Sequence, residues 1–111
     1  MTAFKPFEER VLDLMVAPVI STSRVEVIKR EATLNWVKHT DHGYFLSVDH
    51  PSLPSKKMVF STPFVIGSAN GIESGFVVYI DYNTLTLECY PLLDSDIPPD
   101  YRNYDVIVSA T

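Results

Sequence analysis

The stretch FVVYIDYNTLTLECYPLLDSDIP, residues 76 to 98, predicts a β-hairpin at the centre of the fold. Apolar and polar residues alternate on both sides of Tyr82 and Asn83, which is typical of two half-buried antiparallel strands. A two-residue turn at these positions fixes the register of the hairpin. Three apolar pairs then face each other across the strands: Ile80 with Leu85, Val78 with Leu87, and Phe76 with Cys89. The hairpin therefore has one continuous apolar face, which we expect to line the core.

The same register turns Cys89, the only cysteine of the chain, toward the core. Free cysteine is among the most often buried residue types, whereas a nucleophilic cysteine needs a nearby base and partial exposure. All three histidines lie far upstream, on another predicted hairpin. We therefore expect a buried thiol rather than a catalytic one, with Glu88 on the opposite, outward face. A single cysteine also forms no disulfide within its own chain.

An amphipathic helix is predicted at the start of the chain. Pro6 suits the first turn of a helix, and Glu8 and Glu9 suit its positive end. Apolar residues then recur at helical spacing until Pro18.

Residues 21 to 32 fit either a helix or a strand. Ser23 and Glu26 have the spacing of a capping box, whereas Val25 and Val27 alternate as in a strand. We expect a strand here.

A second hairpin is predicted in residues 34 to 48. If Asp41, His42 and Gly43 form a three-residue loop with Gly43 in the left-handed conformation, Trp36 faces Val48 and Lys38 faces Leu46. Five apolar residues would then share one face: Leu34, Trp36, Tyr44, Leu46 and Val48.

Turn signals complete the predicted architecture. Asn70 and Gly71 favour a type I′ turn between two further strands, residues 51 to 57 predict a loop, and residues 105 to 110 predict a last short strand. No linker divides the chain. We therefore expect residues 1 to 111 to form a single α+β domain, with one N-terminal helix packed on a mainly antiparallel sheet of about five to six strands.

Three histidines and two aspartates have the composition of a metal site: His39, Asp41, His42, Asp49 and His50. In the predicted hairpin, however, His39 and His50 point to opposite faces and lie roughly 20 Å apart along the strands. Only His39, Asp41 and His42 are able to converge, and a lasting site also needs supporting hydrogen bonds. We interpret these three residues as a polar hairpin tip and expect no metal and no cofactor.

Patterns of other common active sites do not occur. Gly67, Gly71 and Gly75 have neither the spacing of a dinucleotide-binding loop nor that of a phosphate loop, and the serines lack the context of a hydrolase nucleophile. We predict no catalytic residue.

The charge distribution favours a protein partner. The net charge is −5, and from residue 70 onward Arg102 is the only basic residue against seven acidic ones. Nucleic acids and anionic lipids are bound through Lys and Arg, so this distribution argues against both. A basic protein surface is the better match.

No apolar run is long enough to span a bilayer, and the first residues do not resemble a signal peptide. With a single cysteine, these features lead us to expect a cytoplasmic protein.

The second half of the chain also holds five of the six tyrosines, interleaved with its acidic residues. Tyrosine is enriched at protein interfaces because its ring is apolar and its hydroxyl is polar. The alternative is that a helix covers this face and the tyrosines belong to a second core. The predicted partner-binding residues are Tyr79, Glu88, Tyr90, Asp94, Asp96, Asp100, Tyr101 and Tyr104.

The segment GFVVYIDYNTLTLECYPLLDSDIPPDYR resembles the C-terminal part of small bacterial immunity proteins of the polymorphic-toxin and contact-dependent-inhibition kind. In those proteins a hairpin ending in a strand of the L-x-L-E-x-Y type is followed by an acidic segment that contains proline. The resemblance covers about residues 75 to 108 and implies a cytoplasmic protein without enzymatic activity that binds and neutralises a toxin domain. From the charge distribution we expect that toxin domain to be basic and nuclease-like. Two alternatives stay open. One is a small hydrolase or isomerase that uses His39, Asp41 and His42 or Cys89, and the other is a structural homodimer.

Overall fold

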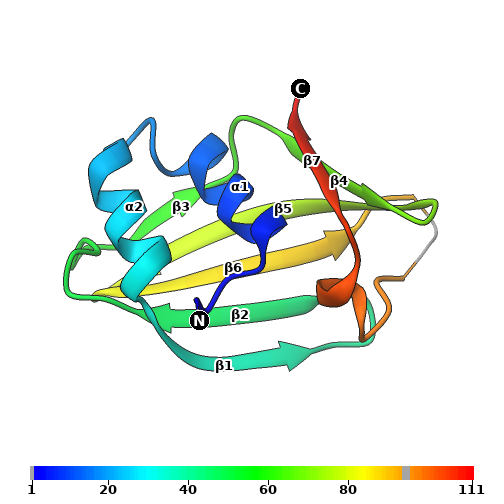
Figure 1. Ribbon diagram of the computed structural model, residues 1–111, viewed down its shortest axis with the longest axis horizontal. Coiled ribbons are helices and arrows are strands. Elements are labelled where there is room, and N and C mark those ends of the chain that lie inside the picture. Colours follow the sequence, from blue (N-terminus) through cyan, green and yellow to red (C-terminus); the bar gives the residue numbers. More distant parts are fainter. Residues whose placement is uncertain (1, 94–95) are drawn as a thin grey trace.

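The computed structural model describes residues 2–93 and 96–111, which form an α+β fold (Figure 1). Its main elements, in chain order, are α1 (Pro6–Met15), α2 (Thr22–Glu31), β1 (Thr33–His39), β2 (Tyr44–Asp49), β3 (Met58–Phe60), β4 (Val65–Ala69), β5 (Ile72–Asp81), β6 (Thr84–Pro91), the short 3₁₀ helix η1 (Tyr101–Asn103) and β7 (Ile107–Ala110). The strands form one antiparallel sheet in the order β1-β2-β6-β5-β4-β7, and β3 pairs with β5. The predicted α+β class is confirmed, but the described residues contain two α-helices and seven strands rather than one helix and five to six strands.

The central hairpin, β5 and β6, has the predicted register. Val78 pairs with Leu87 and Phe76 with Cys89, and Tyr82 and Asn83 both have positive φ, as a type I′ turn requires. The six inward apolar side chains of this hairpin are each 1% exposed or less. The Asn70-Gly71 turn between β4 and β5 is also confirmed, with φ of 53° and 79°.

The β1–β2 hairpin differs from its prediction by one residue. His39 pairs with Tyr44, so the turn contains four residues, and its conformation is held by the Thr40 hydroxyl, which accepts a hydrogen bond from the Gly43 backbone N–H at 2.9 Å. Gly43 is required for a different reason than the predicted left-handed φ. A side chain at this position would collide with the backbone carbonyl of Cys89 on β6.

This register turns Trp36 to the other face, beside Ser47, whereas the bulge between Leu34 and Trp36 leaves Leu34 opposite Val48. Leu34 is 46% exposed and Trp36 is 47% exposed, whereas the three inward residues of β2 are completely buried. The prediction that these five residues share one buried face was therefore wrong.

Residues 22 to 31 form helix α2, so the expected strand was also wrong. The Ser21 hydroxyl caps the helix by accepting a hydrogen bond from the Arg24 backbone N–H at 3.1 Å. Val25 and Ile28, three residues apart, are each 1% exposed and face the core. The alternation of Val25 and Val27 was misleading because Val27 is only half-buried.

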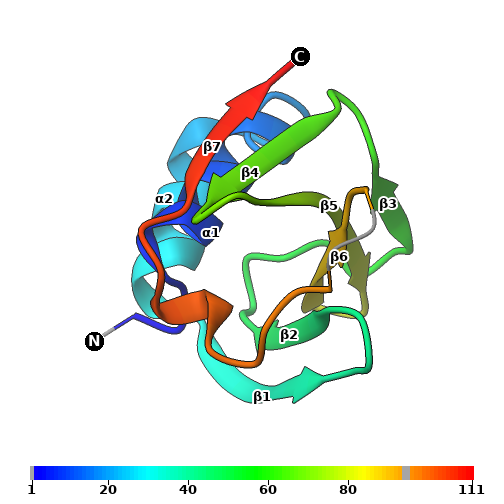
Figure 2. The same ribbon diagram turned by 90° about the vertical axis from the view of Figure 1, so that its right-hand side faces the viewer.

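Both α-helices lie against the same face of the sheet, which curls around them (Figures 1 and 2). We call this helix-covered side the inner face and the opposite side the outer face. The inner face holds a continuous core built from α1, α2 and the inward side chains of the strands. The outer face is convex.

A buried ionic cluster attaches the C-terminal segment to helix α1. Glu8 is completely buried, and both of its carboxylate oxygens accept hydrogen bonds from the Arg102 guanidinium, at 2.8 and 2.9 Å. The Tyr44 hydroxyl donates to the same carboxylate at 2.5 Å. Because an unpaired buried carboxylate is costly, this cluster fixes α1, β2 and η1 relative to one another.

Candidate protein-binding surface

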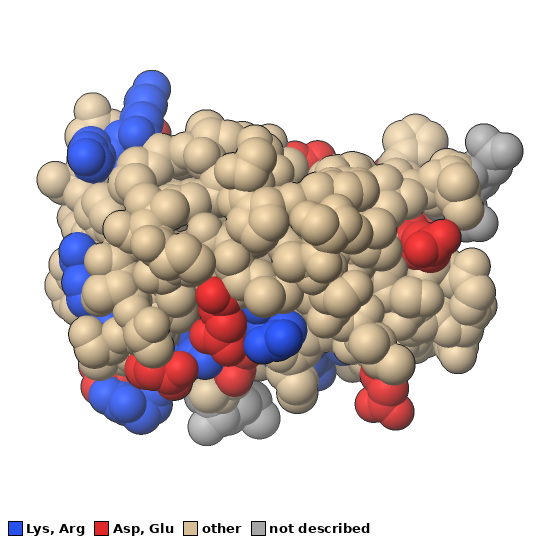
Figure 3. Space-filling model, turned by 90° about the horizontal axis from the view of Figure 1, so that it is seen from above, with Lys and Arg blue, Asp and Glu red and all other residues tan. Residues whose placement is uncertain are grey.

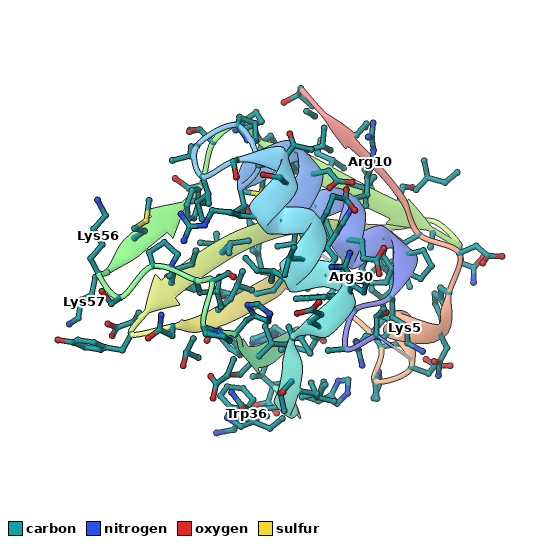
Figure 4. The ribbon with its side chains drawn as sticks, turned by 60° about the vertical axis from the view of Figure 1, so that its left-hand side comes forward. Lys5, Arg10, Arg30, Trp36, Lys56 and Lys57 are labelled. Carbon is teal, nitrogen blue, oxygen red and sulfur yellow. The ribbon has the colours of Figure 1, made fainter. Side chains whose placement is uncertain are left out.

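The outer face carries a row of side chains that crosses five strands. The pairing register places Trp36 beside Ser47, Ser47 beside Thr86, Thr86 beside Tyr79, and Tyr79 beside Val59. We call these residues the aromatic row. Trp36 is 47% exposed, Tyr79 38% and Val59 64%. Figure 4 shows Trp36 projecting from β1 away from the helices.

A second row lies next to the aromatic row on the same face, two residues along each strand. It consists of Lys38, Phe45, Glu88 and Val77. The Tyr79 hydroxyl donates a hydrogen bond to Glu88 at 2.9 Å, and this bond raises the pKa of Tyr79. The two rows together present aromatic and aliphatic groups, with one positive and one negative charge.

Tyr90 lies beyond these rows on β6. Its ring covers Gly75 of β5, where any side chain would collide with it. Tyr79, Glu88 and Tyr90, three of the predicted partner-binding residues, therefore share the outer face as expected. The alternative in which a helix covers these tyrosines is not what the structure shows, since α1 and α2 both lie on the inner face.

A cluster of acidic side chains lies at one end of the sheet. The segment that follows β6 is attached to the β4–β5 hairpin by the Leu92 N–H, which donates to the Glu73 carbonyl, and to the β1–β2 turn by the Ile97 N–H, which donates to the His42 carbonyl. These contacts place the segment beside the β4–β5 hairpin, which carries Glu73, and beside the β1–β2 turn, which carries Asp41. We call the acidic residues of the segment and of these two hairpins the acidic end: Asp41, Glu73, Asp96, Asp100 and Asp105. Arg102, the basic residue of this segment, is occupied by Glu8.

The opposite end of the molecule carries basic side chains. In Figure 3 the blue side chains lie over the left-hand half and the centre, together with red ones, whereas the right-hand end shows red side chains only. Lys56 and Lys57 project from the loop before β3, away from the acidic end (Figure 4). The charge asymmetry along the sequence is therefore also an asymmetry along the long axis of the molecule.

The structure places the remaining predicted partner-binding residues differently. Tyr101 is completely buried and its hydroxyl lies 3.0 Å from the Ser74 hydroxyl, so the prediction that it forms part of the surface was wrong. Its apolar ring fills the core against Phe7. Tyr104 is half-buried, and its hydroxyl donates to Asp100, which is exposed. Asp94 lies outside the described residues.

His39, Asp41 and His42, the residues of the alternative catalytic or metal site, have separate surroundings. The ring of His39 lies 5.9 Å from that of Tyr44. His42 Nδ1 lies 3.0 Å from an Asp96 carboxylate oxygen, which raises the pKa of His42. Within residues 2–93 and 96–111, no three His, Cys, Asp or Glu side chains come together as a metal site would require.

Cys89, the alternative nucleophile, is 1% exposed. Its burial raises the pKa of the thiol to about 12. It is therefore a protonated core side chain, as the hairpin register predicted.

Sequence reasoning missed Trp36 and Val59 as surface residues. Val59 lies between the apolar residues Met58 and Phe60, and Trp36 lies between Asn35 and Val37. Neither pattern shows which face of the strand the rest of the chain covers. The sequence did contain a signal for Trp36, because polar residues surround it. The structure shows that three of them, Asn35, Lys38 and His39, are exposed.

The chain has no significant match among protein-family models, curated proteins or solved structures. Neither of the described α-helices has the length and apolar character needed to cross a membrane.

Proposed function

We propose that this protein is a non-enzymatic binding module, and that it acts as an immunity protein which binds and neutralises a basic toxin domain. The observation that carries the proposal is the exposure of Trp36, Tyr79 and Val59 within the aromatic row of the outer face. Large apolar side chains gathered on an exposed sheet face are a common feature of protein interfaces. Trp36 and Tyr79 are of the residue types that most often dominate binding energy.

The convex shape of the outer face favours a concave partner surface. A convex surface buries a large area only against a groove, and enzyme active sites are concave. Blocking such a groove is a direct way to inhibit a toxin without any chemistry by the inhibitor.

The acidic end supports a basic partner. Carboxylates of the acidic end would accelerate association with a positively charged groove, as phosphates do for a nuclease. The resemblance of residues 75 to 108 to immunity proteins agrees with this assignment, because the acidic segment and the β5–β6 hairpin both belong to that region.

The proposal is tested with the product of the neighbouring reading frame, since an immunity gene normally adjoins its toxin gene. We expect that product to arrest growth when expressed alone, and co-expression of this chain to restore growth. The two purified proteins should form a one-to-one complex. The control is a variant with Trp36→Ala and Tyr79→Ala, which should fold but not restore growth. Failure of the wild-type chain to bind or protect would contradict the proposal.

A homodimer formed through the outer face is the alternative that the same surface permits. Sedimentation velocity of the isolated protein distinguishes the two cases. The immunity proposal predicts a monomer, because the outer face is free until the toxin is present, and the alternative predicts a dimer.

A further inference from the structure

A pocket of about 360 Å³ lies at the margin of the outer face, beside the β5–β6 turn. Its lining residues are Thr33, Asp49, His50, Pro51, Tyr82 and Asn83. Asp49 follows Ser47 of the aromatic row by two positions on the same face of β2. The pocket therefore adjoins the surface proposed to bind a partner.

The hydrogen bonds of the next residue, Asn83, fix the turn that carries Tyr82 beside this pocket. The Asn83 backbone N–H donates to the Pro54 carbonyl at 3.0 Å, and its carbonyl accepts from the His50 backbone N–H at 3.1 Å. The Asn83 side chain also donates to the Leu53 carbonyl. These bonds hold the turn against the loop after β2 and keep the Tyr82 ring, 73% exposed, at the mouth of the pocket.

Tyrosine is an unusual choice for this turn position. Tyr82 has a φ of 51°, a conformation that asparagine and glycine adopt far more readily than an aromatic residue. Tyr82 therefore stabilises neither the turn nor the core. This points to a role for its side chain in binding another molecule. This makes the exposed ring the first of two recognition elements.

Asp49 supplies the second element. Its Oδ1 accepts hydrogen bonds from the Thr84 hydroxyl at 2.6 Å and from the Asn35 side chain at 2.9 Å. These bonds lower the pKa of Asp49, so its carboxylate is charged at neutral pH. Its Oδ2 makes no hydrogen bond with any residue that the structure describes.

His50 forms another wall of the same pocket. Its Nδ1 accepts a hydrogen bond from the Ser52 backbone N–H at 3.0 Å, and its Nε2 lies 3.3 Å from a Glu31 carboxylate oxygen. Both ring nitrogens are thus occupied. The cations at this end of the molecule, Arg24, Lys56 and Lys57, do not line the pocket.

We propose that this pocket binds the guanidinium group of an arginine side chain, between the Tyr82 ring and the Asp49 carboxylate. An aromatic face attracts a cation, and a carboxylate with a free oxygen accepts its N–H groups. Arginine combines a planar cation that stacks on a ring with several fixed donors. The choice of a protein arginine side chain as the source of the guanidinium group rests on the proposed function, which requires a basic protein partner.

The test uses Nα-acetyl-arginine methylamide as a probe, titrated into ¹⁵N-labelled protein and followed by NMR. We expect shifts confined to Thr33, Asp49, His50, Tyr82 and Asn83, with a Kd on the order of 1 mM, as is usual for a single side chain. The citrulline analogue is the matched control ligand, because it keeps the shape of the side chain but lacks the charge. It should not bind.

Three substitutions separate recognition from folding. Asp49→Asn keeps the hydrogen bonds to Thr84 and Asn35 but removes the charge, and we expect it to weaken probe binding about tenfold. Tyr82→Asn suits the turn better than tyrosine, so it should raise Tm while binding falls about tenfold. Tyr82→Phe keeps the ring and should bind the probe normally.

Equal shifts with the citrulline analogue, or full binding by Asp49→Asn and Tyr82→Asn, would overturn the inference. Tight binding of spermidine without binding of the arginine probe would also overturn it, in favour of a polyamine. The outcome is independent of the toxin experiment: a partner bound without a functional pocket contradicts only this inference, and a functional pocket without a partner contradicts only the proposed function.

Discussion

The buried position of Cys89 makes its thiol inaccessible to reagents. It pairs with Phe76 on one side and Tyr44 on the other, and all three side chains are buried. We predict that a thiol reagent does not label Cys89 in the native protein and labels it stoichiometrically after unfolding. Spectrophotometric thiol titration with and without denaturant checks this. Rapid labelling in native buffer would show that the thiol is accessible and would make the nucleophile hypothesis credible again.

At the same scale, the pair formed by Glu8 and Arg102 is expected to contribute strongly to stability. Glu8→Gln leaves the Arg102 guanidinium beside a neutral amide in a buried site. We predict that the free energy of unfolding falls by about 3 kcal/mol, because the partly buried Arg102 charge has lost its partner. Urea denaturation of the variant measures the change.

Glu9→Gln is the matched control for that experiment. Glu9 lies on the same turn of α1, and its carboxylate accepts a hydrogen bond from the Thr2 hydroxyl at an exposed site. We expect a change within about 0.5 kcal/mol, as is usual for surface substitutions. Similar losses in the two variants would mean that the pair with Arg102 has no special role.

At the scale of an element, α2 exists because its cap and its buried stripe outweigh a strand-like alternation. Ser21, and not Ser23 of the predicted capping box, accepts the hydrogen bond from Arg24. We predict that Ser21→Ala lowers the free energy of unfolding by about 1 kcal/mol. Ser23→Ala should change it by less than about 0.5 kcal/mol, since its side chain is exposed within the first turn. Equal effects in thermal or chemical denaturation would show that the cap lies elsewhere.

At the scale of the whole molecule, the acidic end and the aromatic row should affect different kinetic steps of partner binding. Long-range attraction acts before contact and is screened by salt, with a Debye length of about 8 Å at physiological ionic strength. We predict that Asp96→Asn combined with Asp100→Asn slows association and flattens its salt dependence, while dissociation stays unchanged. Surface plasmon resonance with the toxin at several salt concentrations measures both rates.

Tyr79→Ala is the complementary variant. It removes a ring from the centre of the outer face without changing any charge, so we expect faster dissociation and a loss of about 2 kcal/mol in binding free energy, with association unchanged. An unchanged association rate in the double aspartate variant would refute the electrostatic part of the proposal, even if the toxin is bound.

The sequence by itself determined the features that depend on neighbouring residues. The β5–β6 register, the burial of Cys89, helix α1 and the Asn70-Gly71 turn follow from alternation and turn chemistry, which act over a few positions. The charge asymmetry was also readable from the sequence, as was the outward direction of Tyr79, Glu88 and Tyr90.

Only the tertiary structure decided features that depend on distant contacts. Tyr101 is buried because the Glu8–Arg102 pair draws its segment against α1, ninety-four positions away in the chain. The β1–β2 register follows from the close approach of Gly43 to β6 and from the Thr40 side chain, neither of which alternation encodes. Trp36 became a surface residue for the same reason. Apolar periodicity shows that a strand has two faces, but packing of the helices on one of them decides which face remains exposed.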